Sequence, residues 1–305
     1  MPFSDAELVE ALSTCSVASA PGPSHMSWGL MKLFFADDAF HSQFLLLAND
    51  ILTEGIWPAA FKDSVTTVVI LKPRKDDYTK AKNFRPIALL ECAGKLVSKL
   101  IATRLQSDAI QFDLVHTLQF GGLQFRSTTD AGFFLMEYIT KARNARRATS
   151  VLALDIAQFF PSLNHHVIHL MLAKLGFSPL LCALFESYYD NRSTKYLWNV
   201  FFSKDYDTNN GVPQGDPLLP IILVLYLSAV LKVLFPFPTA NVICLSYIDD
   251  FVLAVNNPLL QENIQQLQAA FTQLDQIFGY IGLNIEPSRT KLMQFAAKDQ
   301  EMHQG

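Results

Sequence analysis

Cysteine is scarce in this sequence of 305 residues, and the four that occur are scattered. No two of them have the spacing of a metal-ligand or redox pair, which excludes a disulfide framework as the basis of the fold. They are Cys15, Cys92, Cys182 and Cys244. Residues 1–5 also lack a basic region followed by an apolar stretch, so no signal peptide is expected. Both absences favour a reducing intracellular compartment, either nucleus or cytoplasm.

Charged residues are also few, at 17% of the chain, whereas half of the residues are hydrophobic. This composition can fill a sizeable core and argues against wholesale disorder. The net charge of −4 does not by itself indicate a nucleic-acid-binding protein. Cations are nevertheless concentrated between Lys62 and Arg104, where there are ten Lys or Arg and four Asp or Glu. Such local basic surface matters for phosphate binding, although solvated helix faces are the simpler interpretation of charge alone.

Long hydrophobic runs are absent except at residues 218–237, which are almost continuously apolar and nearly long enough to span a bilayer. Prolines crowd both ends of this run, and Lys232 interrupts it. We therefore predict a helix buried in the core and no membrane partner.

The remaining pattern predicts alternating groups of helices and strands. This order favours an α+β fold with a mostly antiparallel sheet and packed helices. A hairpin is expected with residues 246–250 at its tip. The expected helices are 40–54, 94–111, 129–146, 165–175 and 257 to about 282. The expected strands are 65–71, 150–156, 242–245, 251–255 and a last one at 292–295.

Three aspartates stand beside apolar strands. Asp155 closes the run 151–154, and Asp249 and Asp250 lie between two apolar runs. An ionised carboxylate next to a core is costly unless a partner compensates it. Mg²⁺ is such a partner, because it takes one or two protein carboxylates and leaves its other positions to water and phosphate oxygens. Adjacent strand residues face opposite sides, so we predict Asp155 and Asp249 as principal ligands and Asp250 as a weaker, outer one.

The string Tyr247-Ile248-Asp249-Asp250 is short, and taken alone it is typical of a solvated hairpin turn. Several other segments, however, accompany it in a characteristic order. They are Trp57, Val68-Val69-Ile70-Leu71-Lys72-Pro73, Asn83-Phe84-Arg85-Pro86-Ile87-Ala88-Leu89-Leu90, Gln119-Phe120-Gly121, Arg126-Ser127-Thr128-Thr129-Asp130-Ala131, Leu154-Asp155-Ile156-Ala157-Gln158-Phe159-Phe160, Gly211-Val212-Pro213-Gln214-Gly215, Gly282-Leu283-Asn284 and Thr290-Lys291. Together they resemble the reverse transcriptases of non-LTR retrotransposons, with features shared by group II intron enzymes, over roughly residues 20–296.

The resemblance implies a right-hand polymerase with fingers and palm, and with the thumb absent. The palm would have a mostly antiparallel sheet. The implied domains are an N-terminal helical extension packing on the fingers at 1–60, fingers at 61–148, a palm with the catalytic centre at 149–298, and a tail at 299–305. The missing thumb or endonuclease would come from a longer parent polyprotein.

The resemblance also implies the chemistry of two-metal-ion phosphoryl transfer. Asp155, Asp249 and Asp250 would hold two Mg²⁺ ions, for which Mn²⁺ is a substitute. The substrates would be dNTPs, an RNA template and a DNA primer whose 3′-hydroxyl is extended. Lys291 would protonate the pyrophosphate leaving group.

Substrate-binding roles are implied for further residues. Lys72 and Arg85 would hold the incoming triphosphate, one as a point charge and the other as a planar fork for phosphate oxygens. Gln214 and Gly215 would let the backbone approach the template or primer, since glycine permits close contact. The resemblance implies that Tyr247 also belongs to these substrate-binding residues.

Three functional hypotheses are compatible with the sequence. The leading one is an RNA-directed DNA polymerase domain. Its main rival is a truncated or decayed element fragment that folds but is not catalytically competent; the missing thumb favours it and the three intact aspartates oppose it. The third is an RNA-dependent RNA polymerase. Phe160 opposes this one, because it stands where the family places an aromatic ring under the sugar, which would exclude a 2′-hydroxyl.

Overall fold

The computed structural model describes residues 1–71, 77, 79, 83–198, 200–236 and 241–296. The chain folds as two compact units, and each unit contains two separate stretches of chain. Unit 1 comprises Met1–Leu105 and His165–Leu219, and unit 2 comprises Gln106–Asn164 and Pro220–Gly305. The segments 61–148 and 149–298 are continuous and do not coincide with these units; their assignment as fingers and palm stays a prediction.

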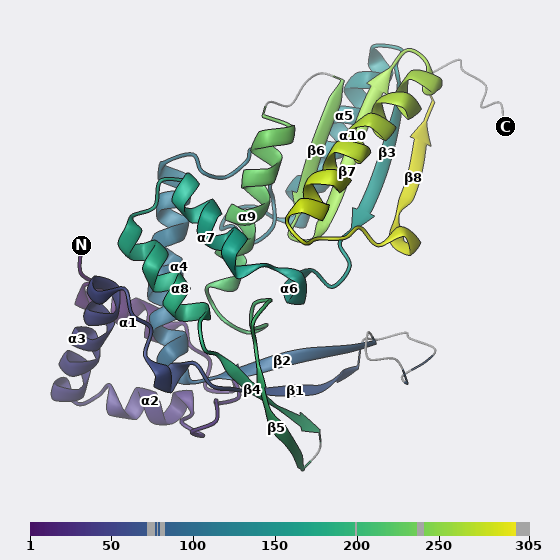
Figure 1. Ribbon diagram of the computed structural model, residues 1–305. Coiled ribbons are helices and arrows are strands. Elements are labelled where there is room, and N and C mark those ends of the chain that lie inside the picture. The colour runs from purple at the N-terminus through teal and green to yellow at the C-terminus, as the bar shows by residue number, and fades with distance from the viewer. Residues whose placement is uncertain (72–76, 78, 80–82, 199, 237–240, 297–305) are drawn as a thin grey trace. The chain divides into compact units, whose positions relative to one another are not determined.

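Unit 1 is built on a four-stranded sheet with the strand order β2-β1-β4-β5 (Figure 1). β1 pairs antiparallel with β2, and β4 pairs antiparallel with β5. β1 and β4 run parallel, with Ser64 opposite Thr194, so the sheet joins two hairpins from distant parts of the sequence. Only β1 was predicted. The strands are β1 (Ser64–Leu71), β2 (Phe84–Leu90), β4 (Ser193–Trp198) and β5 (Phe201–Asp207).

Three of the helices in unit 1 match ranges predicted from the sequence, namely 40–54, 94–111 and 165–175. The expected helix 40–54 ends at Gly55, whose φ of +68° stops it as predicted. In α4 the predicted apolar stripe is buried, with Leu96, Val97, Leu100 and Ile101 all at most 3% exposed. The helices are α1 (Asp5–Ser13), α2 (Trp28–Phe34), α3 (Asp38–Glu54), α7 (His165–Lys174), α8 (Pro179–Tyr189) and the first turns of α4 (Cys92–Gln111).

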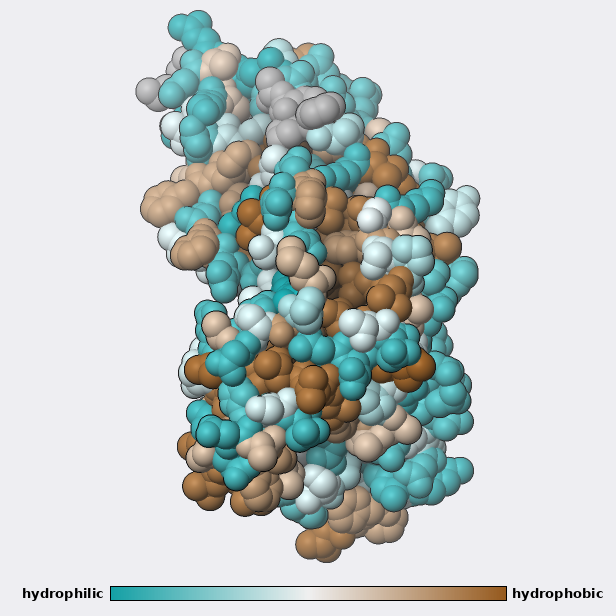
Figure 2. Space-filling model, turned by 90° about the vertical axis from the view of Figure 1, so that its left-hand side faces the viewer, coloured by the Kyte–Doolittle hydropathy of each residue, from teal (hydrophilic) through white to brown (hydrophobic). Residues whose placement is uncertain are grey.

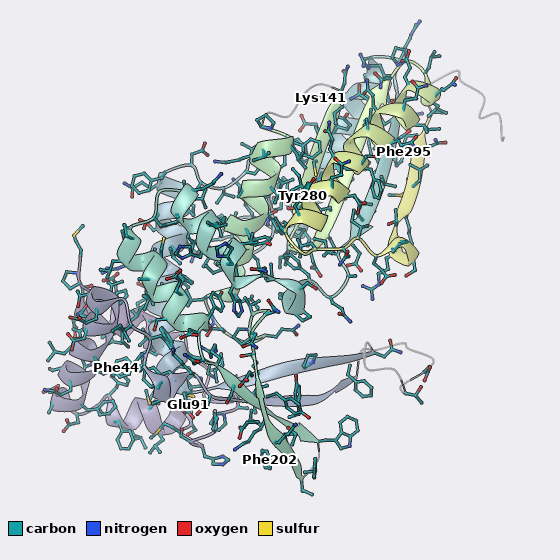
Figure 3. All side chains as sticks on the ribbon, viewed as in Figure 1. Phe44, Glu91, Lys141, Phe202, Tyr280 and Phe295 are labelled. Carbon is teal, nitrogen blue, oxygen red and sulfur yellow. The ribbon has the colours of Figure 1, made fainter. Side chains whose placement is uncertain are left out.

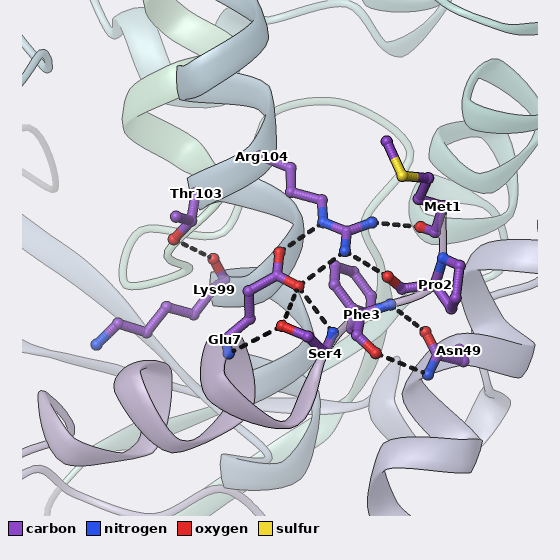
Figure 4. Close-up of polar contacts among 9 residues, drawn as sticks. All are labelled: Met1, Pro2, Phe3, Ser4, Glu7, Asn49, Lys99, Thr103 and Arg104. Atoms are coloured by element: carbon purple, nitrogen blue, oxygen red, sulfur yellow. Dashed lines mark hydrogen bonds and ion pairs between the residues drawn. The ribbon is translucent and has the colours of Figure 1, made fainter.

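Arg104 on α4 fastens the N-terminus to this unit (Figure 4). Its guanidinium donates to both carboxylate oxygens of Glu7, from Nε at 2.7 Å and from Nη2 at 2.9 Å. It also donates to the carbonyl oxygens of Met1 and Pro2 and lies over the Phe3 ring. The bond from Arg104 lowers the pKa of Glu7 to about 2. The first residues of the chain are therefore an integral part of unit 1.

Unit 2 contains a second four-stranded sheet, with the order β6-β7-β3-β8. Every neighbouring pair in it is antiparallel. All four strands were predicted, and β6 and β7 are longer than expected. The prediction of an α+β fold with mostly antiparallel sheets is thus confirmed. The strands are β3 (Ala148–Asp155), β6 (Val242–Tyr247), β7 (Asp250–Asn257) and β8 (Lys291–Phe295).

Helices cover both faces of the sheet in unit 2 (Figure 1). On one face, Phe278 of α10 meets Phe251 of β7, with the ring centroids 5.3 Å apart. On the other face, Ile139 of α5 joins Val151 and Ala254 in one apolar cluster. Alternation along β7 sends Phe251 and Ala254 to opposite faces, which gives each helix its own apolar surface. The helices are α5 (Thr128–Asn144), α6 (Phe159–Ser162), α9 (Leu219–Leu234) and α10 (Leu260–Tyr280).

The long apolar run forms α9, and most of its residues are buried. The Tyr226 hydroxyl, near its middle, donates to the carbonyl oxygen of Ile281 at 3.1 Å. The prediction of a buried core helix is therefore confirmed. Within the part of the chain that the structure describes, no helix is both long and apolar enough to cross a membrane.

Apolar side chains also reach the surface, where they lie among hydrophilic ones (Figure 2). The β4–β5 hairpin of unit 1 is the clearest case. Trp198, Phe201 and Phe202 are 46%, 68% and 52% exposed, and Phe202 projects from β5 (Figure 3). Large apolar residues of this hairpin are exposed, so apolar and polar residues do not alternate along its strands as they do in a half-buried strand. Sequence periodicity therefore did not predict it.

Candidate metal and catalytic site

Two of the predicted metal ligands face each other across the sheet of unit 2. In the antiparallel pairing of β3 with β7, Asp155 lies directly opposite Asp250. Directly opposed residues project from the same face of a sheet, with their Cβ atoms roughly 5 Å apart. The last residue of one strand and the first residue of the other therefore present their carboxylates side by side.

Asp249 reaches the same region from a turn. β6 and β7 form a hairpin in which Tyr247 pairs with Asp250, so Ile248 and Asp249 are the two turn residues. Ile248 has a φ of +56°, a left-handed conformation that β-branched residues rarely adopt. The prediction of Asp249 as a principal ligand and Asp250 as an outer one assumed that both lie on a regular strand. The turn removes that assumption, and it is Asp250 that shares a face with Asp155.

Burial and mutual repulsion disfavour the ionised forms of these carboxyl groups. Burial raises the pKa of Asp249, and the negative charges of Asp250 and Asp155 raise it further. Burial also raises the pKa of Asp250, and Asp155 adds to that effect. The site therefore concentrates negative charge that a divalent cation would neutralise.

Arg289 is the cation beside this group. Its Nη1 donates to Oδ2 of Asp155, whose side chain is only 14% exposed. It lowers the pKa of both Asp249 and Asp250, against the larger effect of burial. No sequence signal singled out this residue. It stands in the short helical turn η3 (Pro287–Arg289), and only the pairing of the neighbouring segment with β3 brings it to Asp155.

That pairing is a short backbone ladder beyond the end of β3. The Glu286 amide donates to the carbonyl oxygen of Asp155 at 2.8 Å, and the Ala157 amide donates to that of Asn284 at 2.8 Å. Ile156 and Ile285 form the bridge between these two bonds. The ladder gives the Gly282-Leu283-Asn284 segment a structural role. It holds the chain after α10 against the strand that ends in Asp155.

The carboxylates fit a magnesium site of the open kind. Among the described residues, no group of three or more His, Cys, Asp or Glu side chains is placed so that it could hold a metal ion. Mg²⁺ does not need such a group, since it commonly binds one or two carboxylates and completes its shell with water and phosphate oxygens. The opposed pair Asp155 and Asp250, with Asp249 in the adjoining turn, matches that donor set.

The other predicted residues of unit 2 lie around the same sheet. Tyr247 ends β6 and packs at the edge of the apolar cluster with α5. Phe160 lies in α6, half-buried, with its ring 5.7 Å from that of Phe159. Lys291 begins β8, opposite Ala153, and is exposed. Ala153 stands two residues before Asp155 on β3, so Lys291 begins its strand two residue pairs from Asp155.

The remaining predicted residues belong to unit 1. The carbonyl oxygen of Gln214 accepts a bond of 3.0 Å from the Ala88 amide on β2. Gly215 has a φ of +118°, and a Cβ there would lie 3.0 Å from the Ala88 carbonyl oxygen. Arg85 pairs through its backbone with Ile70, and its side chain is outside the described part. Lys72 also lies outside the described residues.

Comparison with known proteins gives consistent matches. The family described as "Reverse transcriptase (RNA-dependent DNA polymerase)" matches residues 70–303. A Drosophila melanogaster protein named "Probable RNA-directed DNA polymerase from transposon BS" is 25% identical over 95% of this chain and 32% of its own length. The Drosophila funebris "RNA-directed DNA polymerase from mobile element jockey" is 24% identical over 88% of this chain and 29% of its own length.

A solved structure shares the fold. It is that of apo telomerase from Candida tropicalis truncated from its C-terminal domain, with a TM-score of 0.57 and 12% identity. The similarity covers 85% of this chain and 56% of that one. The chain spans about a third or less of the curated relatives above.

Proposed function

Because the chain belongs to the reverse transcriptase family, whose match covers residues 70–303, we propose that it is an RNA-directed DNA polymerase domain. In this proposal it copies an RNA template by adding dNTPs to the 3′-hydroxyl of a DNA primer. The observation that carries the proposal is the carboxylate pair Asp155 and Asp250 in direct register, with Asp249 in the turn beside them.

The proposed chemistry is two-metal-ion phosphoryl transfer. Asp155, Asp249 and Asp250 would hold two Mg²⁺ ions, or Mn²⁺ in their place. Such ions, when bound, lower the pKa of the primer hydroxyl and neutralise charge on the leaving pyrophosphate. The protein's own contribution is to fix three carboxylates from a strand end and a tight turn, so that little reorganisation is needed at the moment of reaction.

Two cations have different proposed tasks. Arg289 neutralises Asp155 and stabilises the folded site before substrate arrives. An arginine stays protonated at any working pH, so it can stabilise negative charge but cannot deliver a proton. Lys291, exposed at the start of β8, is the proposed donor of a proton to pyrophosphate.

Unit 2 corresponds to the palm in this proposal, and the sheet of unit 1 belongs to the fingers together with the N-terminal helices. The carboxylates of unit 2 support the first assignment. Lys72 and Arg85 would contact the triphosphate. Gln214, Gly215 and Tyr247 would contact the template, primer or nucleotide. Gly215 lies close to the Ala88 carbonyl oxygen, and a side chain at position 215 would occupy the space between them. This supports the proposal that bare backbone is exposed to the template or primer at this position.

Partners and compartment follow from the same proposal. The relatives are about three times as long as this chain, which supports a longer parent polyprotein that supplies a thumb or an endonuclease. The four cysteines are free and buried, in keeping with an intracellular location, nuclear or cytoplasmic.

Primer extension tests the proposed function directly. The whole chain is incubated with a DNA primer annealed to an RNA template, dNTPs and Mg²⁺. We expect extension whose sequence follows the template and which stops when EDTA is added. No extension above the background given by Asp249→Asn would reject the activity for this chain, and would favour the alternative of a truncated or decayed fragment that folds without catalysis.

Replacing Phe160 by valine should admit ribonucleotides. A smaller side chain leaves room for a 2′-hydroxyl, and steric discrimination of this size is typically worth about 10–100-fold. We expect the ratio of kcat/KM for a dNTP to that for the matching rNTP to fall by such a factor. Phe133→Val is the matched control, because Phe133 is 70% exposed in the same unit. An unchanged ratio in Phe160→Val would show that this ring is not the gate.

A further inference from the structure

The turn that carries Asp249 is held from outside the hairpin. A short stretch, residues 118–121, runs beside β6 and is called the strap below. The Ser246 amide donates to the Leu118 carbonyl oxygen at 3.0 Å, and the Phe120 amide donates to the Ser246 carbonyl oxygen at 2.9 Å. These bonds form a parallel bridge between Gln119 and Ser246. The strap therefore extends the sheet at the strand that leads into the turn.

Side chains fix the strap in this place. Gln119 is fully buried, and its carboxamide oxygen accepts a hydrogen bond from the Ser246 hydroxyl. Nη1 of Arg126 donates to the carbonyl oxygen of Gln119 at 2.6 Å and to that of Thr117 at 3.2 Å. A buried, bonded side chain and a charged donor at its backbone both restrict movement of the strap.

Gly121 ends the strap against the turn itself. A Cβ at this position would lie 2.6 Å from the backbone nitrogen of Ile248 and 3.0 Å from the carbonyl carbon of Tyr247. It would also lie 2.6 Å from Cγ1 of Ile248. Two of the three contacts are with backbone, so a side chain at Gly121 would displace the turn and could not be accommodated by a rotamer change alone.

The contact falls on a residue in a strained conformation. Ile248 has a φ of +56°, which is sparsely populated for a β-branched residue and persists only when the surroundings enforce it. The backbone of the strap is the surface against which the Ile248 amide rests. The next residue in the chain is Asp249, so any shift at Ile248 moves that carboxylate.

We propose that Gly121 is a positioning residue for the metal site: the absence of a side chain lets the strap abut the turn and set the place of Asp249. This rests on the proposed function only in that Asp249 is taken as a metal ligand. In this role Gly121 acts through the Tyr247–Ile248 backbone, against which it lies.

Gly121→Ala tests the proposal, with Gly132→Ala as the matched control. Gly132 lies in α5 of the same unit, and a Cβ there would meet nothing within 4 Å. We expect Gly121→Ala to lower kcat in primer extension by about 10–100-fold, because small misplacements of reacting groups have effects of that size. KM for the RNA–DNA duplex should stay unchanged. The Kd for Mn²⁺, measured by electron paramagnetic resonance, should rise by about tenfold or more.

A second variant separates the turn backbone from side-chain packing. Ile248→Ala removes Cγ1 but leaves the Ile248 nitrogen and the Tyr247 carbonyl carbon in place. Combined with Gly121→Ala, it should therefore restore only part of the lost kcat and Mn²⁺ affinity. Full restoration would overturn the proposal, since the contact would then be ordinary side-chain packing. Equal behaviour of Gly121→Ala and Gly132→Ala would overturn it as well.

Amide hydrogen exchange keeps this test independent of the proposed function. In Gly121→Ala, but not in Gly132→Ala, the amides of residues 246–250 should exchange faster while those of α10 remain protected. If the unaltered chain binds Mn²⁺ but extends no primer, the proposed function fails and the Mn²⁺ comparison still decides the role of Gly121. If the unaltered chain binds no Mn²⁺, amide exchange at residues 246–250 decides whether Gly121 positions the turn.

Discussion

Replacing Asp249 by asparagine is expected to lower the kcat of primer extension by about 10³-fold or more. Loss of one charged ligand weakens metal binding at the reacting oxygens, and metal assistance is worth several kcal/mol, or more than two powers of ten in rate. The same variant should unfold at a higher temperature than the unaltered chain when both are free of metal at neutral pH. Activity and stability should therefore change in opposite directions.

The gain in stability follows from the raised pKa of Asp249. Its pKa is raised by burial and by the charges of Asp250 and Asp155, so the folded chain keeps the proton at higher pH than the unfolded chain does. The stability that this protonated form contributes is present at acid pH and is lost as pH rises through the folded pKa. An amide cannot ionise, so the difference in melting temperature should be largest at neutral pH and should shrink toward acid pH.

Asp275→Asn is the matched control, because Asp275 is exposed on α10 of the same unit. Asp275→Asn should change neither the kcat of primer extension nor the melting temperature measurably. The series is completed by Asp155→Asn and Asp250→Asn, for which the direct register predicts losses of similar size. Activity in Asp249→Asn within tenfold of the unaltered chain would contradict the role of this carboxylate. A much smaller loss of activity in Asp250→Asn than in Asp155→Asn would support the prediction that Asp250 is the weaker, outer ligand.

Replacing Asp216 by alanine should destabilise unit 1 by about 2–4 kcal/mol, since it removes the acceptor at the centre of a buried polar network. Asp216 is 6% exposed. It accepts from the Tyr188 hydroxyl at 2.7 Å, from Ser98 Oγ at 3.1 Å and from the Leu218 amide at 2.8 Å. Burial raises the pKa of this carboxyl group, and the bond from Tyr188 opposes that effect. Alanine would leave all three donors buried without a partner.

Tryptophan fluorescence can isolate this effect, because the three tryptophans, Trp28, Trp57 and Trp198, all belong to unit 1. The Trp57 ring lies against Tyr188, at 4.9 Å between centroids, so it reports directly on the network. The urea midpoint should fall in Asp216→Ala and stay unchanged in Asp207→Ala, whose side chain is exposed at the end of β5. Asp216→Asn keeps one acceptor and should lie between them. Equal midpoints in all of these variants would show that the network contributes nothing to stability.

The sequence predicted the parts of the fold whose pattern is local. Each of these parts has an apolar pattern that ends at a recognisable residue or turn. They are the helix before Gly55, the buried α9 and the β6–β7 hairpin. β2 was not predicted, because Pro86 interrupts it and its role depends on pairing with β1. The β4–β5 hairpin was missed because its aromatic residues are exposed, and its parallel pairing with β1 is a contact between distant segments.

The candidate site shows the same division. Asp155, Asp249 and Asp250 could be predicted, because apolar flanks and the order of segments both mark them. Their relative orientation could not, since it depends on the two-residue turn at Ile248. Arg289 carries no local signal, and Gly121 was marked only as part of the segment Gln119-Phe120-Gly121, with no role assigned to it. Each matters only through a neighbour far away in the sequence, Asp155 in one case and Ile248 in the other.

Neither unit is a continuous piece of the chain, and this sets the order in which they can form during synthesis. β3 leaves the ribosome long before β7 and β8, the strands on either side of it. Asp250 is made 95 residues after Asp155, a delay of about 5–20 s at usual rates of translation. Through that interval the nascent chain carries an apolar strand with both edges unpaired, which is a site for aggregation or chaperone binding. A chain released before residue 250 would contain Asp155 without the strand that opposes it.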